Sequence, residues 1–67
     1  MKAAIAIDTW KLPIFERRLK QNGYTYTQSK GVTDDTMLLY VRTDNVMALE
    51  TVIREANIEA AMSLGAR

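Results

Sequence analysis

Polar and aromatic side chains that could bind a ligand occur where the first apolar run of the chain ends. Asp8 and Thr9 offer oxygens for hydrogen bonds, and Trp10 offers a ring on which a base could stack. The same residue types suit a plain strand-to-helix junction, since Asp and Thr are good helix caps and Trp is common in cores and interfaces. The sequence leaves both interpretations open.

A second polar group is predicted in the loop after residue 29. It contains Lys30 and the adjacent carboxylates of Asp34 and Asp35. Two carboxylates could bind a hard cation, although Asp is more typical of turns. The chain has no His and no Cys, so it lacks the commonest metal ligand and the usual general base near neutral pH. No phosphate-loop, dinucleotide or nucleophile motif occurs, and we predict a non-enzymatic protein without metal or cofactor.

The stretch after Trp10 is a third candidate because it is basic. Its cationic side chains are Lys11, Arg17, Arg18 and Lys20. They could contact nucleic-acid phosphates or an acidic partner, but a net charge of +1 weakens the nucleic-acid alternative. The first 30 residues hold six Lys and Arg against two Asp and Glu, and the rest hold three against six. This asymmetry indicates either a basic face for a partner or self-complementary association.

Three strands are predicted from the hydrophobic pattern. Residues 2–8 and 24–29 alternate between two faces, as half-buried strands do. Residues 36–42 are apolar on both faces, which is typical of a strand at the centre of a sheet. Tyr24 and Tyr26 on the second strand could stack RNA bases, but an RNA-binding sheet would need a central strand richer in aromatic residues.

Two helices are predicted between and after these strands. Pro13 suits the first turn of the first helix, and Gly23 suits its end. The first helix has an apolar face formed by Leu12, Phe15 and Leu19. Residues 43–45 are all good caps for the second helix. The second helix has an apolar stripe formed by Val46, Leu49, Ile53, Ala56 and Ala60.

The order β-α-β-β-α restricts the topology. A right-handed crossover makes the first two strands parallel, and the apolar third strand fits between them, antiparallel to both. We therefore predict one α+β domain over residues 1–67, a truncated ferredoxin-like plait whose three-stranded sheet has the order 1-3-2 with two helices on one face. One end of this sheet should gather the predicted ligand-binding residues, which are Asp8, Thr9, Trp10, Lys30, Asp34 and Asp35.

The small size of the chain favours assembly. A domain of 67 residues has a marginal core, and without Cys no disulfide can support it. We predict a homo-oligomer, a dimer or larger, formed through the free edge of the first strand or the sheet face without helices. No run approaches the length of a membrane span and no signal peptide is recognisable, so we expect a cytoplasmic protein with no membrane contact.

Over nearly its whole length the sequence resembles a group of small uncharacterised proteins of tailed bacteriophages. The pattern is W-K-L-x-I-F, G-Y and G-V-T-x-D-T, present here at residues 10–15, 23–24 and 31–36. The resemblance implies a viral origin but no activity. With it, we expect an accessory protein that binds a host protein or a small nucleotide-type ligand, for example in counter-defence. The alternative is a nucleic-acid-binding module using the basic first helix and the tyrosine strand.

Overall fold

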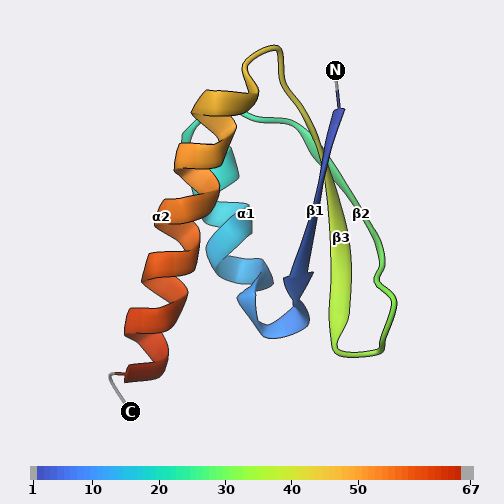
Figure 1. Cartoon of the computed structure of the whole chain (residues 1–67), viewed down its shortest axis with the longest axis vertical. Coiled ribbons are helices and arrows are strands. Elements are labelled where there is room, and N and C mark those ends of the chain that lie inside the picture. The colour runs from blue at the N-terminus through green and yellow to red at the C-terminus, as the bar shows by residue number, and fades with distance from the viewer. Residues whose placement is uncertain (1, 66–67) are drawn as a thin grey trace.

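The described part of the chain, residues 2–65 of this computed structural model, folds into three strands and two helices joined by short turns, with side chains described for residues 2–63. The elements are β1 (Lys2–Asp8), the 3-10 turn η1 (Thr9–Lys11), α1 (Leu12–Gln21), β2 (Tyr26–Lys30), β3 (Thr36–Arg42) and α2 (Val46–Gly65). The sheet has the order β1-β3-β2, and both edge strands run antiparallel to β3 (Figure 1). The predicted α+β fold is therefore confirmed.

The register of the sheet decides which side chains share a face. β1 pairs with β3 from Lys2 opposite Arg42 to Asp8 opposite Thr36. Residues that face each other across an antiparallel pair project to the same side. One face therefore carries the alternating core residues of the strands. The other, which we call the open face, carries Lys2, Ala4, Ala6, Asp8, Thr27, Ser29, Thr36, Leu38, Tyr40 and Arg42.

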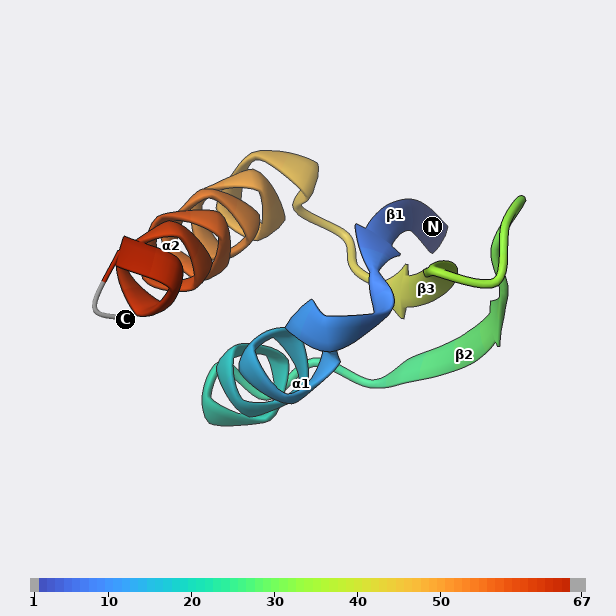
Figure 2. The same cartoon turned by 90° about the horizontal axis from the view of Figure 1, so that it is seen from below.

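Both helices cover the same face of the sheet, and the open face has no helix over it (Figure 2). The largest fully buried side chains are Phe15, Leu19, Leu39, Val41 and Leu49. The predicted stripe of α2 needs one correction: Val52 is buried, whereas Val46 is 38% exposed. Val46 is the first residue of the helix.

The junction between β1 and α1 differs from the prediction. The chain makes a 3-10 turn over Thr9–Lys11 before α1 begins at Leu12. Asp8 makes no capping hydrogen bond through its side chain, and Thr9 lies inside the turn, so the predicted caps are wrong. Pro13 does lie in the first turn of α1, where a missing N–H removes no helical hydrogen bond.

The predicted end of the first helix and start of the second are confirmed. Gly23 has φ 77°, the left-handed conformation that follows α1. Asn45 caps α2, since its Oδ1 accepts a hydrogen bond of 3.1 Å from the Ala48 N–H. Among the described residues, no helix combines the length and the apolar character needed to cross a membrane.

Candidate functional site

The end of the sheet where β1 stops brings together four of the six predicted ligand-binding residues. Asp8, Thr9, Trp10 and Asp35 line a shallow depression there, which we call the junction depression. The Thr9 N–H donates a hydrogen bond of 2.8 Å to the Asp35 carbonyl, which ties the 3-10 turn to the loop before β3. This end of the sheet is therefore fixed by a backbone contact.

The other two predicted residues do not join this depression. Lys30 is the last residue of β2 and pairs with Met37, so β3 lies between it and β1. Asp34 is exposed in the loop and does not line the junction depression. Among the described residues, no group of three or more His, Cys, Asp or Glu is arranged to hold a metal ion.

Trp10 lies on the surface, with 46% of its area exposed. Its predicted role as a core residue is therefore wrong, and an interface or stacking role stays a prediction. The Lys11 ammonium lies 5.5 Å from the centroid of the Trp10 ring, a cation–π distance. The same ammonium lies 3.8 Å from Asp8 Oδ2.

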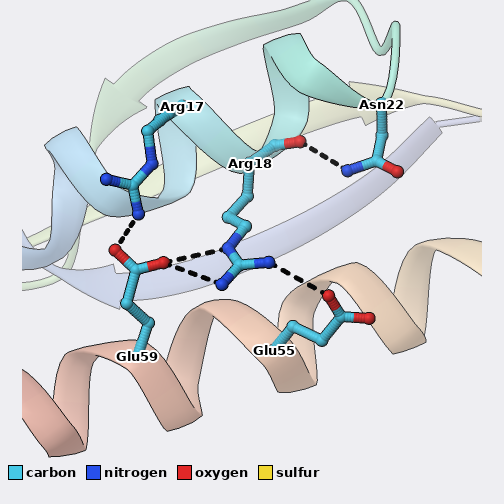
Figure 3. Close-up of polar contacts among 5 residues, drawn as sticks. All are labelled: Arg17, Arg18, Asn22, Glu55 and Glu59. Carbon is cyan, nitrogen blue, oxygen red and sulfur yellow. Dashed lines mark hydrogen bonds and ion pairs between the residues drawn. The ribbon is translucent and has the colours of Figure 1, made fainter.

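The basic side chains of α1 meet acidic side chains of α2 (Figure 3). Arg18 Nη2 lies 2.9 Å from Glu59 Oε1, and Arg18 Nη1 lies 3.1 Å from Glu55 Oε2. Arg17 also forms an ion pair with Glu59. We call these four residues the interhelix seam. They tie α1 to α2, because each carboxylate comes from the helix opposite its cation.

The interhelix seam leaves fewer cations of the basic stretch available to contact a partner. Arg17 and Arg18 are neutralised by α2, and Lys11 has Asp8 beside it. Lys20 is exposed and makes no ion pair among the described residues. Sequence reasoning missed the seam, although Glu55 and Glu59 have the i, i+4 spacing that puts two carboxylates on one side of a helix.

A second depression lies at the opposite end of the open face, and sequence reasoning missed it. Its volume is about 460 Å³, and we call it the cationic depression. Its lining residues are Lys2, Thr25, Tyr26, Thr27, Tyr40 and Arg42. Lys2 and Arg42 face each other across the β1–β3 ladder. The available signal was that the first strand begins, and the third strand ends, with a basic residue.

Tyr26 joins the cationic depression to the helix layer. Its hydroxyl donates a hydrogen bond of 2.8 Å to Glu16 Oε2 on α1. Burial of the phenol, together with the hydrogen bond and the negative charge of Glu16, raises the pKa of Tyr26 to about 12. The contact anchors β2 to α1.

These features give the described surface two polar depressions. The cationic depression combines two cations with hydroxyl groups and two aromatic rings, and the junction depression combines carboxylates with Trp10. Comparison of the chain with protein-family models, curated proteins and solved structures gives no match.

Proposed function

We propose that the chain is a small non-enzymatic accessory protein of the tailed-phage kind. In this proposal it acts in the host cytoplasm by binding, and it does so as a homo-oligomer. The observation that carries the proposal is the outer side of α2, opposite the side that faces the core. Met47, Ile58 and Met62 are 79%, 54% and 69% exposed there. We call these three residues the outer stripe.

The outer stripe consists of two separate groups, Met47 near the start of α2 and Ile58 with Met62 near its end. Leu49 and Ala56, on the inner side, are 1% and 0% exposed. Exposed Thr51 and Arg54 lie between the two groups, so an apolar contact would centre on Ile58 and Met62. Ile58 and Met62 also line a shallow, mostly apolar groove beside the interhelix seam. Burial of these side chains against a partner would add apolar contact to a core of this size.

A second copy of the chain suits this surface by charge. At 100° per residue, Arg54 and Glu55 lie on opposite flanks of the outer stripe. When two copies of a helix pack in parallel about a twofold axis, the left flank of each faces the right flank of the other. This arrangement would place Arg54 of each copy beside Glu55 of its partner, a carboxylate that also pairs with Arg18 of its own chain, with the outer stripes between the two helices.

The chemistry of the chain supports binding over catalysis. It has no His, the usual general base near neutral pH, and no Cys to serve as a thiol nucleophile. The proposed target is a host protein or a small nucleotide-type ligand. The alternative, nucleic-acid binding through the basic first helix, loses support because Arg17 and Arg18 form ion pairs with α2.

Native mass spectrometry and analytical sedimentation test the proposed assembly directly. We expect a dimer or a larger closed oligomer for the wild type, and dissociation to the monomer for Ile58→Glu with an unchanged circular dichroism spectrum. Val32→Glu is the matched control, because Val32 is 98% exposed in the loop before β3. A monomeric wild type at micromolar concentration would overturn the proposed assembly. Equal effects of Ile58→Glu and Val32→Glu would show that the outer stripe is not part of the interface.

A further inference from the structure

Two cations face each other at one end of the open face without a protein anion between them. Lys2 and Arg42 are direct partners in the β1–β3 register, and like charges in such positions destabilise an antiparallel pair. Neither forms an ion pair among the described residues. Asp44 lies two residues beyond Arg42, but it does not line the cationic depression. This end of the sheet therefore has uncompensated positive charge.

An aromatic ring lies next to these cations. Tyr40 precedes Arg42 by two residues, so both project to the open face. Its partners across the two ladders are Ala4 and Thr27. Both have short side chains, which leave room beside the partly buried Tyr40 ring. Thr25 and Thr27 add hydroxyl groups that can donate or accept hydrogen bonds.

We propose that the cationic depression binds a nucleoside phosphate. The phosphate lies between Lys2 and Arg42, and the base stacks on Tyr40. A phosphomonoester is close to a dianion at neutral pH, which matches the two cations. The Arg42 guanidinium can hold two phosphate oxygens at once, and base–aromatic stacking accepts any base. A volume of about 460 Å³ lies within the range of small-ligand sites.

The rest of the open face favours a single nucleotide over a long strand. Lys2 and Arg42 are the basic residues of this face among the described strands, because Lys30 pairs with Met37 and so projects to the helix side. Ala4, Ala6 and Leu38 follow along the face, and Asp8 ends it. A continuing strand would meet neutral side chains and then a carboxylate, which repels its phosphates.

The inference deepens the proposed function and rests on it, because it names the ligand class that the assembled protein would bind. The wild-type chain is titrated at low salt with nucleoside 5′-monophosphates, the corresponding nucleosides, inorganic phosphate and short oligonucleotides. Calorimetry measures affinity, and amide chemical shifts locate the ligand. We expect the nucleotides to bind and to shift residues 2, 25–27 and 40–42. Absence of shifts at millimolar nucleotide, or shifts confined to other residues, would overturn the proposal.

Three variants test the roles of the lining residues. Arg42→Gln should weaken nucleotide binding by about tenfold or more, because a hydrogen bond to a charged group is worth at least one decade of affinity. Lys20→Gln removes the same charge from an exposed position of α1 and should change nothing. Tyr40→Leu should weaken nucleotide binding and leave phosphate binding unchanged. Equal losses for Arg42→Gln and Lys20→Gln would overturn the site.

The outcomes separate this site from the proposed assembly. Affinity that rises with oligonucleotide length would overturn the single-nucleotide assignment in favour of a strand. An intact oligomer that binds no nucleotide would overturn the site and leave the assembly standing. Shifts in the wild type give the location even if Arg42→Gln does not fold. A monomer that binds nucleotides would overturn the assembly alone.

Discussion

The two ends of the sheet differ in how their polar groups are satisfied. At the junction depression, Thr9 N–H bonds to the Asp35 carbonyl at 2.8 Å and Asp8 lies 3.8 Å from the Lys11 ammonium. At the cationic depression, Lys2 faces Arg42 and both lack an ion-pair partner among the described residues. The polar residues that the sequence singled out at the junction depression are therefore largely bonded to their neighbours. The unpaired charge lies at the other end of the sheet, where the strand register places Lys2 opposite Arg42.

Gly31→Ala should disturb the end of the sheet at the junction depression and leave the cationic depression intact. A Cβ at Gly31 would lie 2.6 Å and 2.7 Å from the backbone carbon and oxygen of Thr36, so the loop before β3 would have to move. We expect a loss of about 1–3 kcal/mol in the free energy of unfolding, measured by chemical denaturation, with nucleotide affinity at the cationic depression retained. Gly23→Ala is the control for backbone strain alone, since no atom lies within 4 Å of its Cβ.

The pH dependence of stability tests the link between Tyr26 and α1. Burial and Glu16 raise the pKa of Tyr26 from 10.0 to about 12 in the folded chain. The unfolded chain loses the phenol proton first, so this contribution is complete below pH 10 and is lost as the pH rises through 12. We expect the free energy of unfolding to fall more steeply over this interval in the wild type than in Tyr26→Phe.

This comparison removes other titrations, because the lysines and remaining tyrosines are common to both proteins. Urea denaturation at pH 9, 10, 11 and 12 gives the two curves. Parallel curves for the wild type and Tyr26→Phe would show that the hydrogen bond to Glu16 does not hold the phenol proton.

Lys2→Glu should increase the stability of the fold and abolish nucleotide binding. It turns a like-charge pair opposite Arg42 into an attractive pair, and we expect a gain of about 0.2–1 kcal/mol in the free energy of unfolding. Nucleotide binding should be lost, because a carboxylate would repel the phosphate. Lys30→Glu, at an exposed position of β2, is the matched control. A stability loss for Lys2→Glu would show that Lys2 and Arg42 do not repel each other in the folded chain.

Asp8→Ala should have the smallest effect. Asp8 makes no capping hydrogen bond, and its ion pair with Lys11 spans 3.8 Å with 52% of the Asp8 side chain exposed. We expect a change within about 0.5 kcal/mol in the free energy of unfolding. A loss above about 1 kcal/mol, the typical value of a helix cap, would restore a structural role to Asp8. Thermal denaturation beside the wild type is sufficient to measure it.

The fold could be predicted because hydrophobic spacing is a local signal. The apolar run Thr36–Arg42 required a central strand, and Gly23 and Asn45 marked helix boundaries by their own backbone and side-chain preferences. The 3-10 turn at Thr9–Lys11 could not be predicted, because it depends on the hydrogen bond from Thr9 to Asp35, 26 positions away. Tertiary contacts here decided where the helix began.

The candidate sites were harder to predict for the same reason. Whether Arg18 is free or neutralised depends on how α1 packs against Glu55 and Glu59 of α2. Whether Lys2 and Arg42 meet depends on the register of two strands, which a shift of one residue would change. Residue types suggest which chemistry is possible. Contacts between helices and the register between strands decide which charged side chains remain free to bind a ligand.

The position of β3 at the centre of the sheet has a consequence for how the chain folds. β2 and β3 are joined by a short loop, so their hairpin can form as soon as residue 42 has emerged from the ribosome. β1 is made first, yet it has no partner until β3 exists, and its pairing closes the longest loop in the sheet. We expect docking of β1 to limit the folding rate, and newly made β1 to remain open to non-native pairing until then.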